Sequence, residues 1–311
     1  MKNEAAEQIE DEKMMNDKEN NLPFMDLEQA HQRLGHRSFR SLLTGSTNQI
    51  WHDYQLRPEK ESFWNTCAIS TRQVANRNLN DPNKATRNFE RIFLDIIKCP
   101  SKQSLSISTS YSYLLFGVDQ KTQFTFIEGL TNKETSTILL NLDKIFTRLK
   151  FCSKHPIQVH HIRGDADSVF NSAQFGQYAE KHNISVSLAA PHHQEQNGVC
   201  ERTWQTVNNI GRKFLVHARL SNHFYFFSRK YAVEIVNILP TKHITDDQGK
   251  ITTPYFLVIG RKPRIGKFKT FGCPVSFKRY EPIFQGNIIT NQQQLQQASI
   301  TLAFWQILQD I

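Results

Sequence analysis

The sequence predicts an α/β fold, a mixed five-stranded sheet flanked by helices, with a small N-terminal helical module that contains His and Cys. Short runs of aromatic and β-branched residues alternate along the chain with longer segments of helical periodicity. The chain is also 39% hydrophobic, which is enough for a buried core. The expected strands are residues 89–97, 113–118, 124–128, 157–162 and 184–189, and the expected helices are residues 131–149, 172–182, 198–218 and 224–239.

The first three strands lie close together in the chain. Phe89–Ile97, Tyr113–Val118 and Phe124–Glu128 combine aromatic and β-branched residues, which favour a pleated surface. The short segment 119–121 joins the last two strands as a hairpin. We therefore expect three successive antiparallel strands before the first long helix.

The later elements alternate between helix and strand. Residues 131–149 repeat apolar side chains with a helical period, and Pro240 ends the last expected helix because proline cannot continue one. Three antiparallel strands and a helix, then strand–helix–strand and further helices, is the order of a ribonuclease H-like domain. This order favours that fold over a generic three-layer sandwich.

The charge balance indicates a polyanionic partner. The 311 residues carry a net charge of +9 at pH 7. The first twenty contain seven acids and three bases, a net charge of −4, so the remainder carries about +13. Clustered Lys and Arg bind nucleic acid by releasing counterions from its phosphates. Five scattered cysteines argue against a disulfide framework. With no apolar stretch long enough to span a bilayer, we expect a soluble intracellular protein without a membrane partner.

Three carboxylates stand in distinctive settings. Asp95 interrupts an apolar strand, Asp165 closes a strand, and Glu201 begins a helix 35 intervening residues after Asp165. Carboxylate oxygens are preferred by Mg²⁺, and two such ions can activate and stabilise the oxygens of a phosphodiester reaction. The trio predicts a two-metal site for Mg²⁺ or Mn²⁺, with Asp167 as an alternative ligand. Taken singly, each acid also fits an ordinary turn, cap or solvated position.

Polar residues near Glu201 are candidates for DNA contacts. A period of 3.6 residues places Gln205, Asn208 and Arg212 on the helix face of Glu201. The loop before the helix adds His193 and Asn197. We expect these five side chains to line a groove beside the metals.

The sequence around these acids resembles the integrases of copia-type LTR retrotransposons, which have a D,D(35)E triad. Matching segments are 162–165 (Ile-Arg-Gly-Asp), 196–202 (Gln-Asn-Gly-Val-Cys-Glu-Arg), 253–255 (Thr-Pro-Tyr), 260–263 (Gly-Arg-Lys-Pro) and 271–274 (Phe-Gly-Cys-Pro). With residues 31–36, the likeness covers about residues 27–276. The resemblance implies 3′-end trimming and strand transfer of element DNA by Asp95, Asp165 and Glu201. It also implies a homo-oligomer that binds element ends and target DNA, with RNA as a further candidate, in nucleus and cytoplasm.

The N-terminal module resembles a damaged zinc site. His31 and His36 have the spacing of the family's two histidines, which are completed there by two cysteines two residues apart. Here Cys67 is present, but the positions three before and three after it are Trp64 and Ser70. A three-ligand Zn²⁺ site with water in the fourth position is one interpretation. The other is that His31, His36 and Cys67 are remnants in a small helical bundle. His52 is a further candidate for the missing ligand, although nothing in its spacing recommends it.

The resemblance divides the chain into five parts. They are an acidic disordered tail (1–26), a degenerate zinc-binding-like module (27–72), a linker (73–86), the integrase catalytic core (87–245) and a basic post-core segment with a flexible tail (246–311). Around Asp165 the family's Asp-Asn-Gly-(Gly/Ser)-Glu-Phe is altered, with Asp167 in place of a glycine and Val169 in place of a carboxylate. We interpret the chain as a fragment of an element polyprotein, either a decaying copy or a processed product. A catalytically inactive nucleic-acid-binding module is the alternative function, and a stand-alone RNase H-type nuclease is disfavoured by the spacing of the acids.

Overall fold

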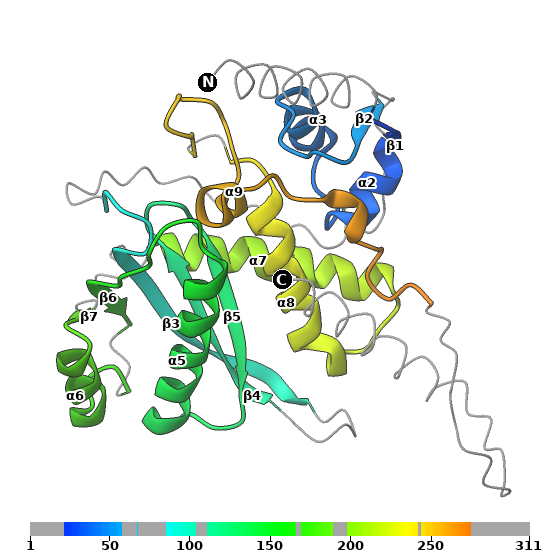
Figure 1. Cartoon of the computed structure of the whole chain (residues 1–311). Helices are drawn as coiled ribbons and strands as arrows, with labels where there is room; N and C mark the ends of the chain where they lie inside the picture. Colours follow the sequence, from blue (N-terminus) through cyan, green and yellow to red (C-terminus); the bar gives the residue numbers. More distant parts are fainter. Residues whose placement is uncertain are drawn as a thin grey trace, which may run out of the picture.

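A five-stranded mixed sheet forms the centre of the protein (Figure 1). The computed structural model describes residues 22–57, 67, 85–103, 111–165, 169–188, 198–241 and 244–274. The strand order is β5-β4-β3-β6-β7. The strands are β3 (Arg91–Gln103), β4 (Tyr111–Asp119), β5 (Thr125–Leu130), β6 (His161–Gly164) and β7 (Ser185–Leu188).

The pairing of the strands matches the predicted fold class. β3, β4 and β5 are antiparallel neighbours, whereas β6 and β7 add in parallel on the other side of β3. The mixed sheet of a ribonuclease H-like core is therefore confirmed. The expected strand 157–162 is shorter than predicted, because β6 begins at His161, opposite Arg91 where β3 begins. Earlier residues have no partner strand at that edge, although Ile157 and Val159 are buried.

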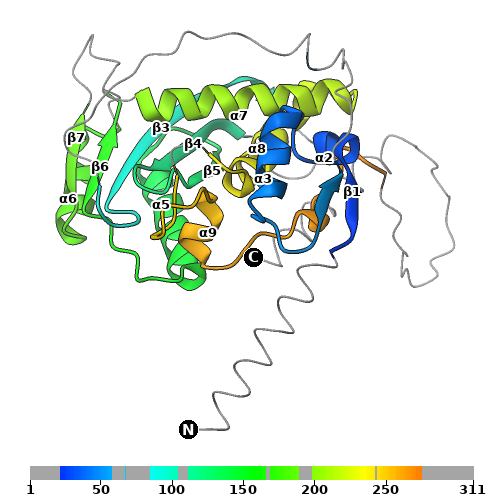
Figure 2. The same cartoon turned by 90° about the horizontal axis from the view of Figure 1, so that it is seen from above.

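Helices cover both faces of the sheet. α5 (Thr135–Cys152) and α6 (Ala173–Lys181) pack on one face, and α7 (Gly198–His217) and α8 (Tyr225–Ile238) on the other (Figure 2). Alternate residues of β3 serve the two layers: Ile92 and Leu94 belong to the α5 side, and Phe93 to the α7 side. This alternation is the period-2 geometry of a strand. Asp95 therefore falls on the α7 side.

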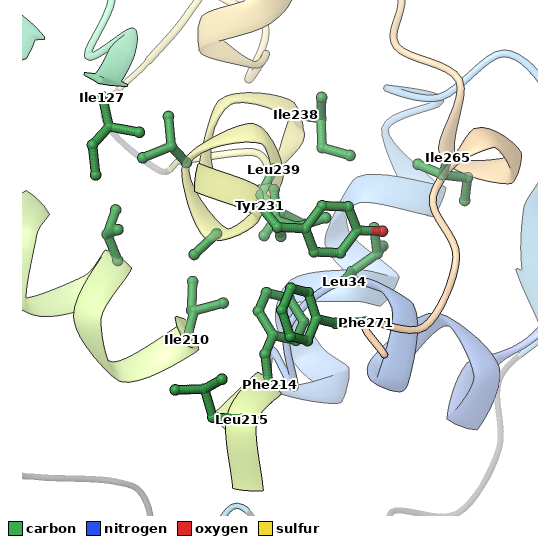
Figure 3. Packing of buried hydrophobic residues seen from close by; sticks show 14 of the residues in the cluster. Leu34, Ile127, Ile210, Phe214, Leu215, Tyr231, Ile238, Leu239, Ile265 and Phe271 are labelled. Carbon is green, nitrogen blue, oxygen red and sulfur yellow. The ribbon is translucent and has the colours of Figure 1, made fainter. Parts of the chain in front are cut away.

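The N-terminal module docks against α7 and α8. It contains β1 (Phe24–Asp26), α2 (Leu27–Arg33), α3 (Phe39–Thr47) and β2 (Gln55–Arg57), with β1 and β2 parallel. Its Leu34 lies in one hydrophobic cluster with Phe214 of α7 and Tyr231 of α8 (Figure 3). The indole Nε1 of Trp51 donates to the Ile238 carbonyl at 3.2 Å. The module and the sheet's α7 face thus share a core.

The post-core segment returns to the same cluster. Its helix α9 (Pro254–Ile259) is capped by Thr253, whose hydroxyl accepts from the Phe256 amide. Further on, Phe271 stacks on Phe214 with ring centroids 5.3 Å apart (Figure 3). The Asp53 carboxylate accepts from the amides of 265 and 266 at 3.0 and 2.7 Å, which ties this segment to the N-terminal module.

Some predicted regions lie outside the described residues. These are most of the tail 1–26, most of the linker 73–86 and the end of the chain after 274. Within the described ranges, no helix is both long enough and apolar enough to cross a membrane. The division of the chain into five parts stays a prediction.

Candidate active site and His/Cys cluster

Asp95 and Asp165 lie side by side on neighbouring strands. β3 and β6 pair in parallel with Ile92 opposite Ile162 and Phe93 opposite Arg163. Continuing this register by two residues brings Asp95 level with Asp165. Asp95 is half-buried within its strand, and Asp165 is exposed directly after β6 ends. The two carboxylates therefore reach the same edge of the structure from adjacent strands.

Helix α7 brings Glu201 to this place. Glu201 lies in the first turn of α7, which contacts both β3 and β4. One turn further on, the ring of Trp204 packs against Phe116 with centroids 5.2 Å apart. Phe116 is the cross-strand partner of Asp95. Because residues three apart on a helix share a face, this aromatic contact holds the start of α7 over the strand that carries Asp95.

Cys200 lies next to Glu201 in the first turn of α7. Its side chain is fully buried. Burial, and then the negative charges of Asp95, Glu201 and Asp165, raise the pKa of the Cys200 thiol well above its ordinary value. The structure places Asp95 in β3, Asp165 directly after the adjacent β6, and Glu201 in the first turn of the helix that contacts β3.

The donor set of these acids fits hard divalent cations. Three carboxylates and solvent supply only oxygen ligands, as Mg²⁺ and Mn²⁺ prefer. Among the described residues, however, the three acids do not form a group whose ligand atoms all lie within 4.8 Å of one another.

The predicted DNA contacts on α7 separate into two kinds. Gln205 is exposed and Arg212 half-buried. Asn208 faces inward instead, because its Oδ1 accepts from Nη2 and Nε of Arg229 at 2.7 and 3.2 Å. Arg229 is almost completely buried and also lies over the Tyr225 ring. The oxygen of Asn208 therefore serves helix packing. The other predicted contacts, His193 and Asn197, and the alternative ligand Asp167 lie outside the described residues.

One of the altered residues in the turn after Asp165, Val169, does not lie on the α7 face of the sheet. Val169, which stands where the family has a carboxylate, is buried with Phe170 in the cluster on the α5 side of the sheet. Its replacement of a carboxylate therefore removes no charge that faces the acids in this structure.

A second cluster of ligand-type side chains lies in the N-terminal module. His31, His36 and Cys67 are the one group within the described ranges whose metal-ligand atoms lie within 4.8 Å of each other. Cys67 Sγ is 3.3 Å from His31 Nε2 and 3.7 Å from His36 Nδ1. A tetrahedral Zn²⁺ with ordinary bond lengths would give sulfur–nitrogen edges of about 3.6 Å. His52 does not join the group; its Nε2 accepts from Arg264.

The surroundings of the cluster also suit a metal. His31 Nδ1 is 2.7 Å from the Arg37 carbonyl, so this nitrogen is the donor and Nε2 carries the lone pair toward Cys67. Burial first, then the nearby charges of His31, His217 and Lys213, lower the pKa of His36 to about 3. A neutral imidazole is the form that binds metal. The residues present therefore fit a zinc ion.

Sequence reasoning missed two residues beside this cluster. Both come from the last turns of α7: Lys213 Nζ donates to the His36 carbonyl at 3.3 Å, and the His217 ring lies 4.9 Å from the His36 ring. They stand far from His36 in the sequence, so no local spacing could have identified them.

Taken together, the strand order defines a ribonuclease H-like core, with Asp95 in β3, Asp165 directly after β6 and Glu201 in the first turn of α7. Over 189 residues the chain is 24% identical to the retrovirus-related Pol polyprotein from transposon RE1 of Arabidopsis thaliana and 25% identical to that from transposon RE2. Each match covers 61% of this chain but only 12% of the relative's length. This finding confirms the resemblance to copia-type retrotransposon polyproteins. No family model matches the chain.

Solved structures give a weaker likeness. The HTLV-2 integrase catalytic core domain in complex with magnesium is 15% identical, with a TM-score of 0.40 over 56% of this chain and 99% of that one. A simian T-cell lymphotropic virus intasome in complex with PP2A regulatory subunit B56 gamma is 14% identical, with a TM-score of 0.43 over 70% of this chain and 67% of that one.

Proposed function

We propose that this chain acts in DNA integration as a metal-dependent polynucleotidyl transferase, the integrase part of a retrotransposon polyprotein. It would trim the 3′ ends of linear element DNA and join them to target DNA. The observation that carries the proposal is the placement of three acids on adjoining elements: Asp95 lies in β3, Asp165 directly follows the adjacent β6, and Glu201 lies in the first turn of α7, which contacts β3. The similarity to transposon Pol polyproteins supports the same function, although the chain spans only 12% of their length.

Each of the three acids would have its own role at the site. Asp95, fixed within β3, and Asp165, at the end of β6, would hold two Mg²⁺ or Mn²⁺ ions from adjacent strands. Glu201 would complete the set from the helix side. Bound ions would supply Lewis-acid stabilisation of the phosphodiester oxygens and lower the pKa of an attacking water.

Basic and polar groups would position the DNA. On α7 we retain Gln205 and Arg212 as contacts, together with His193 and Asn197 of the preceding loop. Asn208 is a weaker candidate because Arg229 occupies its oxygen. Element ends and target DNA are the proposed partners, with RNA as a further candidate. A homo-oligomer would be needed because one active site handles one DNA end, and we propose nucleus and cytoplasm as its location.

One assay tests the enzyme directly. The purified full chain is incubated with Mg²⁺ or Mn²⁺ and a labelled duplex that ends in the element's own terminal sequence. We expect trimming and joining, and their loss in Asp95→Asn, Asp165→Asn and Glu201→Gln. Glu180→Gln is the matched control, since Glu180 is an exposed helical glutamate on α6, away from the acids. Activity that survives Glu201→Gln would refute the metal assignment.

The same experiment separates the alternative function. If the protein binds the duplex but neither trims nor joins it with either metal, the result would support the alternative function, an inactive nucleic-acid-binding module. A protein that cuts RNA–DNA hybrids without preference for element ends would favour a stand-alone nuclease.

A further inference from the structure

Among the described residues, the His/Cys cluster has three ligand-type side chains, His31, His36 and Cys67. The second thiolate of the family is missing, because its two candidate positions hold Trp64 and Ser70. Structural zinc sites are almost always four-coordinate and closed by protein groups. A fourth protein ligand would come from an element packed against the cluster, and α7 is such an element.

We propose that His217, the last residue of α7, is the fourth ligand of a structural Zn²⁺ held with His31 Nε2, His36 Nδ1 and Cys67 Sγ. Its ring already contacts His36, with centroids 4.9 Å apart and an interplanar angle of 59°. The site would then be a Cys-His₃ site. The ion would join the N-terminal module to the end of the helix that begins beside Glu201.

The His217 ring would have to move for the ion to bind. Its nitrogens lie outside the set whose ligand atoms are within 4.8 Å of one another, so the ring must turn toward Cys67. The side chain is only partly buried, so this rotation is not opposed by dense packing on every side. The two sulfur–nitrogen edges that Cys67 makes with His31 and His36, 3.3 and 3.7 Å, are close to the length expected around zinc.

Nearby charges have two opposite effects on zinc binding at this site. The C-terminal end of a helix carries partial negative charge, which favours a cation beside the last residue of α7. One thiolate leaves a Zn²⁺ site with a net charge of +1, and the Lys213 ammonium lies near Cys67. We therefore expect weaker binding than in a two-thiolate site. His52 is not a competitor for the fourth position, because it pairs with Arg264.

Metal binding by the full chain tests the proposal. The metal-free protein is titrated with Zn²⁺ against a chromophoric chelator, and with Co²⁺ while its visible absorption is recorded. We expect about one equivalent and the intense bands of a tetrahedral ion. His217→Ala should weaken Zn²⁺ binding by at least about ten- to hundredfold and diminish the cobalt bands. His223→Ala is the matched control: this exposed histidine follows α7 and pairs with Ser221.

Two further variants keep the proposal falsifiable if His217→Ala folds poorly. His217→Cys should retain tight binding and add thiolate absorption to the cobalt spectrum. Trp64→Cys in the His217→Ala background should restore binding by returning the second thiolate. Binding by His217→Ala as tight as that of the unaltered chain would overturn the proposal. Less than about a tenth of an equivalent in the unaltered chain would overturn it as well. None of these readouts depends on DNA cleavage.

Discussion

The Trp204 ring of α7 packs edge-on against Phe116 of β4, 5.2 Å between centroids, and Phe116 sits directly opposite Asp95 in the sheet. This contact joins the helix that carries Glu201 to the strand that carries Asp95. The relative position of two acids that lie far apart in the sequence thus depends on aromatic packing beneath them.

Removing Phe116 should therefore damage both stability and the site. Phe116 is fully buried, and truncation of such a ring costs about 3–5 kcal/mol. We expect Phe116→Ala to lower the free energy of unfolding in urea by that amount, and Phe116→Leu by roughly half of it. Phe151→Ala is the control, because Phe151 is 87% exposed; its effect should stay within about 0.5 kcal/mol. A Phe116→Ala protein as stable as the control would contradict this account of α7.

Divalent ions should stabilise the fold through the three acids. An ion that binds these acids in the folded state alone stabilises that state by mass action. At about ten times its dissociation constant, Mg²⁺ should add about 1.4 kcal/mol to the free energy of unfolding. The measurement is the melting temperature with Mg²⁺ against NaCl of equal ionic strength. An equal Mg²⁺ response in Glu201→Gln would rule out these acids as its origin.

Asn208 and Arg212 should differ sharply when each is replaced by alanine. Asn208→Ala leaves the buried Arg229 guanidinium without its amide acceptor, so it should lower the free energy of unfolding by about 2–3 kcal/mol. The salt dependence of DNA binding should not change. Arg212→Ala should leave stability nearly unaltered and reduce the slope of log affinity against log salt by about one. The two measurements are urea unfolding and binding to a labelled duplex at several salt concentrations. A reduced slope in Asn208→Ala would restore the DNA role predicted from the sequence.

The sequence predicted the fold well because the signals of the fold are local. Aromatic and β-branched residues predicted β3, a helical repeat of apolar side chains predicted α5, and the order of elements predicted the ribonuclease H-like sheet. The fourth strand was placed too early because pairing depends on where its neighbour begins, and β3 begins only at Arg91. Apolar residues before His161 are buried without being in a strand.

The sequence predicted only those site residues that belong to a recognisable motif. The spacing of Asp165 and Glu201 is visible in the sequence, and the structure places Asp165 directly after β6 and Glu201 in the first turn of α7. Helical periodicity could not show that Asn208 faces Arg229, since that partner belongs to α8. Nor could it place His217 beside His36, because only the docking of the module on α7 brings these rings together.

The buried Asp119 should make the free energy of unfolding depend on pH. Burial raises the pKa of Asp119 to about 6, although donors from Thr122 and Phe89 oppose this shift. Since the unfolded value is about 3.9, the protonated form is favoured by folding. Its contribution is complete below about pH 4 and is lost as the pH rises through about 6.

Comparison with Asp119→Asn isolates this effect, because the amide does not titrate. The unfolding free energy of the unaltered chain minus that of the variant should fall by about 2–3 kcal/mol between pH 4 and 6. Both free energies are measured by urea unfolding across this pH range. The contributions of the other carboxylates cancel in the difference. A flat difference would mean that Asp119 titrates normally in the folded protein.

The docking of the N-terminal module on α7 depends on Gly35. Its φ of 73° lies in the left-handed region, and a Cβ there would stand 2.5 Å from Ile210 Cγ2, a buried side chain of α7. Gly35→Ala should therefore lower the free energy of unfolding by about 2–4 kcal/mol, from backbone strain and overpacking together. Gly176→Ala in α6, where a Cβ meets nothing within 4 Å, should instead raise it by about 0.5–1 kcal/mol. Urea unfolding of both variants tests this prediction. If Gly35→Ala lowers the free energy of unfolding no more than Gly176→Ala does, the N-terminal module does not pack against α7 as the structure describes. His217 would then lie too far from His36 to share its ion.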